Sequence, residues 1–285
     1  MKVLITGAGG LVGRAVSEHC RKSGDEVLSY DHKSLDITDR GLVRQTIVRD
    51  TPDVVINCAA WTDVDGCEKD AARAFAANAQ GPENLALASR DVNAVFITIS
   101  TDYVFDGTKE GFYTQEDEPN PLSVYGRAKL EGEQRSQEAN KESIIVRSGF
   151  IFGRGGTNFL STVVDRARRN EPLKAITDSY GTPTYARDLA QRLRELGEMK
   201  HAGVFHVVNS GEGTSYAGFV REAVRRANLG EPPIEEVLTA SLNRPAPRPQ
   251  NSRMRCLYSP ALGLPPLPDW RDALSRFALE TIGPI

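Results

Sequence analysis

A short apolar segment followed at once by spaced glycines opens the chain. Residues 2–6 are Lys-Val-Leu-Ile-Thr, and the next glycines include Gly7, Gly10 and Gly13. In a strand–turn–helix unit the first glycine permits a tight turn, the second lets the backbone approach a pyrophosphate, and the third lets helix pack on strand. A helix over residues 11–23 would then direct its N-terminal amides at the phosphates. The spacing therefore predicts a dinucleotide site on an α/β fold.

Apolar segments alternate with helical patterns as far as residue 147, and the alternation weakens afterwards. The further strands are expected at 26–30, 53–57, 94–100, 143–147 and 204–208, and the main helices at about 39–50, 68–90, 158–169 and 184–198. This order predicts a Rossmann-type, doubly wound parallel sheet. Ten of the sixteen prolines lie beyond residue 230, so turns are expected to interrupt the final segment.

Two domains are expected from this change in pattern. Residues 1–150 with about 183–210 would form the dinucleotide-binding Rossmann domain. Residues from about 151–182 with 211–285 would form a smaller, discontinuous C-terminal substrate-binding lobe.

The end of the second strand bears on the choice of cofactor. Asp31 follows the glycines by about 20 residues, where a carboxylate can accept both ribose hydroxyls and repel a 2′-phosphate. His32 and Lys33 come next, and either can neutralise that phosphate. NADH and NADPH therefore both remain open. Asp36 can lie against the adenine or cap the helix at 39–50, with Thr38 as the rival cap.

Tyr125 and Lys129 stand four residues apart at the start of a helix that Pro119 and Pro121 introduce. Positions i and i+4 share a helix face. A nearby cation lowers a tyrosine pKa from about 10, which makes the phenol a usable proton donor. Thr101 follows the strand at 94–100, and ligands of parallel sheets bind beyond the carboxyl ends of the strands, so its hydroxyl can meet Tyr125. Alone, the Tyr–Lys pair is typical of an amphipathic surface helix.

Composition excludes several other functions. A formal charge of -3 and a pI near 5.9 give no attraction to nucleic acid polymers or anionic membranes. No apolar run approaches the roughly 18 residues of a membrane span, and the amino terminus has no signal-peptide pattern, so we expect a cytoplasmic protein. The four cysteines and four histidines have no metal-ligand spacing, so no metal is expected and the cysteines are interpreted as buried fillers.

Three motifs together resemble the extended short-chain dehydrogenases/reductases: the glycine turn, Ser100-Thr101-Asp102-Tyr103-Val104-Phe105, and Val124-Tyr125-Gly126-Arg127-Ala128-Lys129. More narrowly, the chain resembles the dTDP-4-dehydrorhamnose reductase family nearly end to end. The segments that carry this likeness are 59–65, 180–184, 248–253 and 267–270.

This resemblance implies reduction of the 4-keto group of dTDP-4-dehydro-L-rhamnose to dTDP-L-rhamnose, with NADPH or NADH as cofactor. Tyr125 would donate the proton, Lys129 would lower its pKa and hold the nicotinamide ribose, and Thr101 would bond the carbonyl oxygen. The matching substrate contacts are Thr101, Asp102 and Phe150. The matching cofactor contacts, besides Gly7, Tyr125 and Lys129, are Gly10, Leu11, Val12, Asp31, Asp36, Ile37, Ala60, Trp61, Thr62 and Ile99.

The chain departs from the family pattern at three positions. Relatives often carry Trp where Phe150 stands, so stacking can persist without the indole donor. Some relatives bridge a dimer with magnesium through two glutamates, but the matching positions here are Ala15 and Arg187. A magnesium-bridged interface is therefore not expected, while a homodimer stays open.

Other functions on the same fold remain alternatives. Dehydratases carry Thr-Asp-Glu, and Tyr103 in the third position argues against elimination. Sugar-nucleotide epimerases share the Tyr and Lys and retain oxidised cofactor, and another sugar-nucleotide reductase is also possible on these residues. Asn78, inside the long predicted helix, is interpreted as an ordinary polar position. The NADP-binding regulatory subunit of methionine adenosyltransferase is similar to this family and binds dinucleotide to control a partner.

Overall fold

The computed structural model describes residues 1–282 and is built around a six-stranded, all-parallel sheet. The strand order is β10-β5-β4-β3-β1-β2. The bounds are β1 Lys2–Thr6, β2 Glu26–Tyr30, β3 Val54–Asn57, β4 Val95–Thr101, β5 Ile144–Ser148 and β10 Gly203–His206. The chain passes from β1 to β2 on one side and to β3 on the other, so a crevice opens at the carboxyl ends of β1 and β3. The predicted doubly wound sheet is confirmed.

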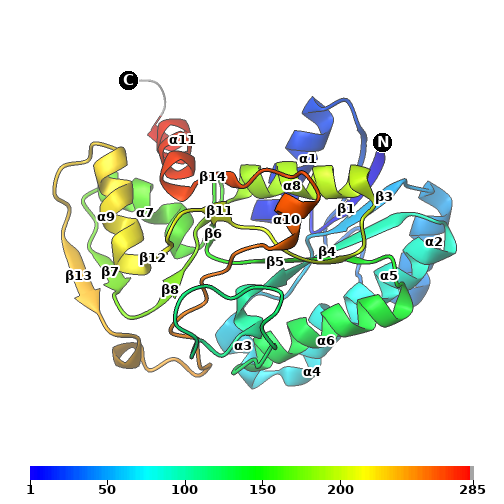
Figure 1. The fold of residues 1–285 in the computed structure, drawn as a ribbon, viewed down its shortest axis with the longest axis horizontal. Coiled ribbons are helices and arrows are strands. Elements are labelled where there is room, and N and C mark those ends of the chain that lie inside the picture. The colour runs from blue at the N-terminus through cyan, green and yellow to red at the C-terminus, as the bar shows by residue number, and fades with distance from the viewer. Residues whose placement is uncertain (283–285) are drawn as a thin grey trace.

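Helices cover both faces of the sheet (Figure 1). Val3 and Ile5 are fully buried in the core beneath helices α1 and α8, whereas Leu4 is buried on the other face with residues of α2 and α5. Parallel strands buried on both faces are expected to be continuously apolar, as these are. The helices are α1 Leu11–Lys22 and α8 Ala186–Met199 on one face, and α2 Arg40–Asp50, α5 Gly81–Asp91 and α6 Val124–Ala139 on the other.

The long helix predicted over 68–90 is wrong, because the segment is broken. It forms α3 Val64–Lys69, α4 Ala71–Phe75, a π-helical turn over Ala76–Gln80, and then α5. Asp70 leaves the helical conformation at φ -139° and its carboxylate caps α4 by accepting from the Arg73 amide at 3.0 Å. Asp39 caps α2 in the same way, at 3.0 Å from the Leu42 amide, so neither rival cap predicted for that helix is used.

A second core lies beside the sheet. Phe152, Phe219 and Phe277 are buried there together with Trp270. Its elements are α7 Phe159–Arg168, α9 Tyr216–Arg226, α11 Trp270–Ile282 and the parallel strands β7 Leu173–Ile176 and β13 Ile234–Val237. Helix α7 was predicted, whereas α9 and α11 were not. The prolines beyond residue 230 drew the expectation for the region of α11 towards turns, but they do not account for the missed α9. The two-domain division stays a prediction, and the separate cores support it.

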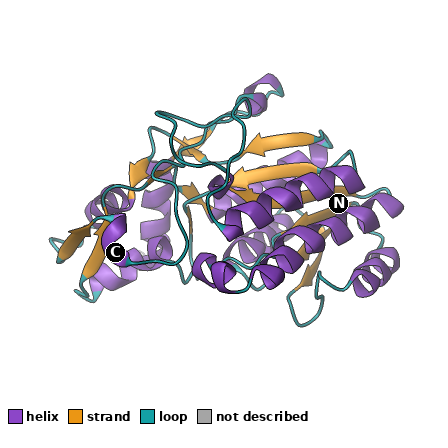
Figure 2. Cartoon of the chain, turned by 90° about the horizontal axis from the view of Figure 1, so that it is seen from below, coloured by secondary structure: helices purple, strands orange, loops and turns teal. Residues whose placement is uncertain are grey.

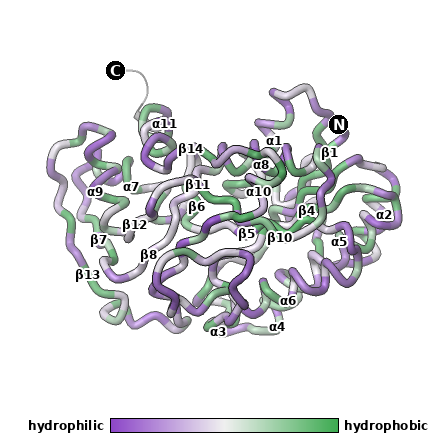
Figure 3. Tube along the Cα trace, in the orientation of Figure 1, coloured by the Kyte–Doolittle hydropathy of each residue, from purple (hydrophilic) through white to green (hydrophobic). Residues whose placement is uncertain are grey.

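The six-stranded sheet with its helices is here called the first part, and the elements around the second core are called the second part. Short strands and loops join the two parts, and the loops gather between them (Figure 2). The pairs are β6 Ile151–Phe152 with β9 Thr184–Tyr185, β8 Tyr180–Gly181 with β12 Thr214–Ser215, and β11 Asn209–Ser210 with β14 Leu267–Asp269. Residues 246–256, here called the strap, run from the second part back towards the sheet, and helix α10 Tyr258–Ala261 follows. Apolar residues concentrate along the strands, and polar residues dominate the outer turns (Figure 3). Within residues 1–282 no helix is long and apolar enough to cross a membrane.

Candidate active site

The glycine turn packs as its spacing predicts. Gly7 has φ +63°, and a Cβ there would lie 2.6 Å from the Ala59 amide nitrogen. A Cβ on Gly13 would lie 2.2 Å from the Gly7 carbonyl oxygen, so helix α1 could not pack this closely with any larger residue. Gly10 is the N-cap of α1 and supplies no side-chain acceptor to the first turn. This helix end therefore fits the phosphates of a dinucleotide.

Arg14 joins this turn to a second glycine-rich loop, which sequence reasoning missed. Its guanidinium donates at 2.6 Å to the Gly9 carbonyl and at 2.6 Å to the Gly155 carbonyl. The positive charge thus lies one helical turn from Gly10, near the place predicted for the phosphates. No spacing rule connects two residues 141 positions apart.

Three predicted adenosine contacts lie away from the main cavity. The Asp31 carboxylate accepts from the amides of Lys33 and Ser34 and from the Ser34 hydroxyl, and the Ser34 bonds lower its pKa. The Asp36 carboxylate accepts from the amide and hydroxyl of Thr38. The Ile37 side chain is buried in the core against Gly81 and does not face the cavity.

The loop after β3 is held by Asn78. Its amide oxygen accepts from the Trp61 amide at 2.9 Å, and its amide nitrogen donates to the Trp61 carbonyl at 3.0 Å. Asn78 is 1% exposed, so the interpretation as an ordinary polar position is wrong. This clamp places Ala60 and Thr62 on the cavity wall, while the Trp61 ring lies under the Arg73 guanidinium, 4.4 Å from its centroid.

Tyr125 and Lys129 share a buried face of α6, which Ser123 caps through the Gly126 amide at 3.1 Å. The Lys129 ammonium donates to the Ile99 carbonyl at 2.6 Å, and burial lowers its pKa to about 8. Burial raises the pKa of Tyr125, and the neighbouring Thr101 hydroxyl opposes this rise. For the chain by itself desolvation therefore raises the tyrosine pKa, and the lowering of that pKa by Lys129 stays a prediction.

A buried ion pair lies one turn beyond Lys129. The Arg147 guanidinium donates three hydrogen bonds to the Glu133 carboxylate, at 2.7 to 3.1 Å, and the Ser100 hydroxyl donates a fourth. Both charged side chains are nearly inaccessible. The pair joins α6 to β5 and β4 directly beneath the predicted catalytic residues, and sequence reasoning missed it.

Asp102 and Phe150 lie on the side of the cavity that faces the second part. The Asp102 carboxylate accepts from the Thr101 hydroxyl at 3.0 Å and from the Ser252 hydroxyl at 2.5 Å. Phe150 adopts φ +47°, and its ring contacts that of Tyr216 at 4.4 Å between centroids. The space for the Phe150 ring depends on Gly181, since a Cβ there would lie 2.3 Å from it.

These residues meet around one cavity of about 620 Å³. Of the predicted residues, those on its wall are Gly10, Leu11, Val12, Ala60, Thr62, Ile99, Thr101, Asp102, Tyr125, Lys129 and Phe150. Gly7, Asp31, Asp36, Ile37 and Trp61 are not on it. The wall also carries Lys174, Tyr216 and Arg244 from the second part, which no motif identified. Ser148 contributes a buried hydroxyl that has no hydrogen-bond partner among the described residues, so it can bond a ligand.

The structure also shows the surroundings of the possible metal ligands and of the cysteine on the cavity wall. Among residues 1–282 no three His, Cys, Asp or Glu side chains gather as a metal site. Arg187 stands where some relatives carry a magnesium-binding glutamate, and its guanidinium pairs with Glu18 at 3.5 Å and with Glu280. Cys58 lies on the cavity wall, where burial raises its pKa to about 12 and keeps the thiol neutral.

The glycine turn of the Rossmann sheet and the Tyr-x-x-x-Lys helix face one cavity, which the second part covers. This is the architecture of the extended short-chain dehydrogenases/reductases. Solved structures support this class at the level of the fold. A UDP-glucose 4-epimerase of Thermus thermophilus in complex with NAD superposes with a TM-score of 0.85 at 20% identity, over 100% of both chains.

Closer comparisons identify the family. The family profile described as RmlD substrate binding domain matches residues 1–282. A dTDP-4-dehydrorhamnose reductase of Streptomyces griseus is 36% identical over 96% of this chain and 91% of its own. The crystal structure of a dTDP-4-dehydrorhamnose reductase from Clostridium acetobutylicum has a TM-score of 0.94 at 36% identity, covering 99% of this chain and 100% of that one. The one from Bacillus anthracis, in complex with NADP, has a TM-score of 0.93 at 34% identity, covering 98% and 100%. The chain belongs to the dTDP-4-dehydrorhamnose reductase family.

Proposed function

We propose that the protein reduces the C4 ketone of dTDP-4-dehydro-L-rhamnose to dTDP-L-rhamnose, with hydride from NADPH or NADH. The observation that carries this proposal is the single cavity on which the α1 N-terminus, Thr101, Tyr125 and Lys129 meet Phe150 and Tyr216. Cofactor and substrate can therefore lie against one another within reach of a proton donor.

The residues of the first part would hold the cofactor and supply the proton. A bound nicotinamide supplies the hydride. The amides at Leu11 and Val12 bind the cofactor phosphates, and Lys129 holds the nicotinamide ribose. Tyr125 donates its proton to the alkoxide that develops at C4; its raised pKa keeps the phenol protonated at neutral pH, as a donor requires.

Residues from the other side of the cavity would hold the sugar nucleotide. The rings of Phe150 and Tyr216 offer an apolar face to the sugar, and Asp102 bounds the same end of the cavity. Lys174 and Arg244 bring positive charge to this wall, which suits the two phosphates of dTDP.

Cofactor preference, assembly and location are parts of the same proposal. An ionised Asp31 disfavours a 2′-phosphate, while Lys33 beside it favours one, so both NADH and NADPH remain candidates. The reaction is placed in the cytoplasm, where we expect the protein from its sequence. A homodimer stays open as the assembly, and a magnesium-bridged interface is not expected.

The test is an assay of the purified protein with NADPH or NADH and a panel of 4-keto nucleotide sugars, with the product identified by mass and NMR. Reduction of dTDP-4-dehydro-L-rhamnose to dTDP-L-rhamnose is expected. Cofactor binding without consumption on any sugar would favour the regulatory alternative, and sugar inversion without net consumption would favour an epimerase.

A different 4-keto sugar is the second candidate. A relative in Streptomyces antibioticus, 35% identical over 96% of this chain, is named as a probable dTDP-4,6-dihydroxy-2-methyloxan-3-one 4-ketoreductase. The same Tyr125 chemistry would serve that substrate. The sugar giving the highest kcat/KM in the panel decides between the two.

A further inference from the structure

The strap carries the sequence Arg248-Pro249-Gln250-Asn251-Ser252-Arg253, and the proposed function gives none of these residues a role. We propose that Ser252 is a positioning residue for the reduction: its hydroxyl fixes the Asp102 carboxylate, which in turn orients the Thr101 hydroxyl beside Tyr125. The inference rests on the proposed function and extends it to a segment about 150 residues away from Asp102 in sequence.

The contact between the strap and Asp102 is buried and direct. The Ser252 hydroxyl donates to Asp102 Oδ2 at 2.5 Å, and both side chains are at most 3% exposed. The other carboxylate oxygen, Oδ1, accepts from the Thr101 hydroxyl at 3.0 Å. Because so little of either side chain is exposed to solvent, each bond has a large effect on the carboxylate.

The Thr101 hydroxyl has one hydrogen, so its partner decides what it offers to the cavity. While Asp102 is ionised, that hydrogen points at Oδ1, and the oxygen accepts from the Tyr103 amide at 3.2 Å. The same oxygen lies beside the Tyr125 phenol, whose pKa it influences. The orientation of the Asp102 carboxylate therefore determines the direction of a hydroxyl that borders the proton donor.

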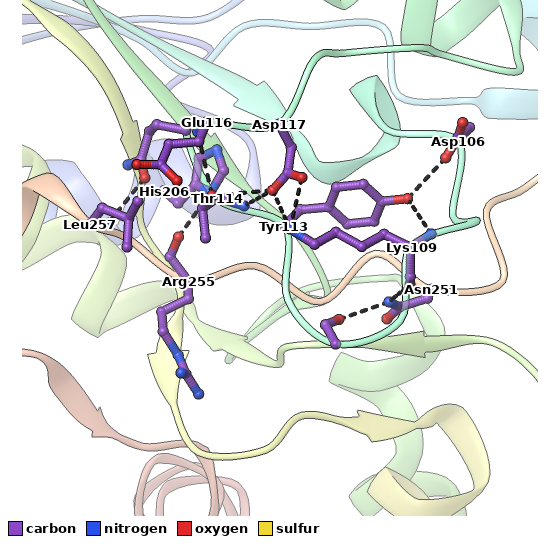
Figure 4. Close-up of polar contacts among 12 residues, drawn as sticks. Asp106, Lys109, Tyr113, Thr114, Glu116, Asp117, His206, Asn251, Arg255 and Leu257 are labelled. Atoms are coloured by element: carbon purple, nitrogen blue, oxygen red, sulfur yellow. Dashed lines mark hydrogen bonds and ion pairs between the residues drawn. The ribbon is translucent and has the colours of Figure 1, made fainter.

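The strap is anchored so that Ser252 can hold this position. The Ser252 amide donates to the Tyr180 carbonyl at 2.8 Å. Asn251 donates to the carbonyls of Lys109 at 2.6 Å and Gly111 at 2.8 Å, in the loop that Figure 4 shows beside it. Arg248 makes a bidentate pair with the Asp65 carboxylate, at 2.8 and 2.9 Å. The hydroxyl is thus presented by a rigid backbone, which a positioning role requires.

The carboxylate also has little freedom on its other side. A Cβ on Gly149 would lie 2.3 to 2.6 Å from the three terminal atoms of the Asp102 side chain. Asp102 is therefore packed directly over the Gly149 backbone, with Ser252 and Thr101 closing its two oxygens. Besides burial, the Asp102 carboxylate raises the pKa values of the phenols of Tyr103, Tyr125 and Tyr216, which face it.

The test compares three variants with wild type. Ser252→Ala removes the hydroxyl, and Ser252→Thr restores one. Thr182→Val is the matched control, since the Thr182 hydroxyl also anchors the strap, accepting from the Met254 amide at 3.2 Å, but forms its hydrogen bonds with Met254 and not with Asp102. We expect Ser252→Ala to lower kcat on the order of tenfold with unchanged cofactor affinity. Ser252→Thr should recover most of that loss, and Thr182→Val should keep the wild-type kcat even where it lowers the Tm.

A second readout does not depend on turnover. Burial raises the pKa of Asp102 to about 6, and the Ser252 bond opposes this rise. The titration of the Asp102 carboxyl can be followed by carbon NMR, and the Asp102→Asn variant assigns the signal. Loss of the Ser252 donor should raise the pKa of Asp102 in Ser252→Ala, and Ser252→Thr should return it to the wild-type value.

The outcomes separate the two proposals. Given an active wild type, the role of Ser252 would be overturned by an unchanged kcat in Ser252→Ala or by an equal loss of kcat in Thr182→Val. It would also be overturned if Ser252→Thr did not recover kcat, or if the carboxyl titration did not shift. A wild type that reduces no 4-keto sugar overturns the proposed function and the catalytic role together, whereas the titration still reports whether Ser252 controls Asp102.

Discussion

The substitution Glu133→Gln should destabilise the protein strongly, because it leaves the buried Arg147 guanidinium without a counter-charge. Glu133 and Arg147 have side chains 3% and 7% exposed. The carboxylate accepts three hydrogen bonds from Arg147 and one from Ser100. A glutamine keeps one acceptor oxygen and turns an amide group towards the other donors, so at least one guanidinium N–H loses its partner.

The expected loss is about 3 to 5 kcal/mol of unfolding free energy, the usual effect of removing one partner from a buried ion pair. This is a large share of the roughly 5 to 15 kcal/mol by which proteins are stable. The pair itself need not stabilise the fold, because desolvation offsets its attraction. The double substitution Glu133→Leu with Arg147→Met should therefore recover most of the loss.

Urea unfolding followed by circular dichroism measures these differences. Glu131→Gln is the control: Glu131 lies on the same helix and pairs with Arg135 four residues on, but the two side chains are 34% and 42% exposed. Its loss should stay below about 1 kcal/mol. A Glu133→Gln variant that unfolds within about 1 kcal/mol of wild type would refute the reasoning about the buried charge.

Three further predictions concern the cavity. The Lys129 ammonium has a pKa lowered to about 8, so the positive charge is present below that pH and lost above it. The value of kcat/KM for the cofactor should therefore fall as the pH rises through about 8. In Glu133→Gln this fall should begin at lower pH, because the Glu133 carboxylate favours the charged form of Lys129. Asp31→Ala should raise the ratio of kcat/KM for NADPH to kcat/KM for NADH on the order of tenfold, because it removes a charge that repels a 2′-phosphate. An unchanged ratio would show that the ribose 2′ group of the cofactor does not bind beside Asp31. Gly149→Ala should lower kcat at least about tenfold, because its Cβ would meet the Asp102 carboxyl at 2.3 Å, and near-normal kinetics would show that Asp102 can move without effect.

Local patterns predicted the sheet well because each strand carries its own signal. The six strands of the main sheet begin within one residue of their expected positions, as for Lys2–Thr6 and Glu26–Tyr30. Continuous apolar segments between glycine and charged turns leave little choice of conformation. Helix α11 also had a readable signal, since Trp270, Leu274 and Phe277 recur at helical spacing, but the prolines before it drew the interpretation towards turns.

The site was predictable only where its residues belong to local motifs. The spacing of Tyr125 and Lys129 places both on one face of α6, but it says nothing of desolvation, which raises the pKa of the tyrosine. The long-range partners, such as Ser252 with Asp102 or Asn78 with Trp61, depend on how the chain folds back on itself. Motif matching named the strap sequence without showing what it contacts.

The most direct test of the account is single-turnover reduction by Tyr125→Phe, which keeps the ring and removes only the proton. The account predicts that the rate of product formation from dTDP-4-dehydro-L-rhamnose falls by about 10² to 10⁴-fold, while the Kd for the cofactor, measured by fluorescence, stays that of wild type. A Tyr125→Phe variant that forms product at nearly the wild-type rate would contradict it.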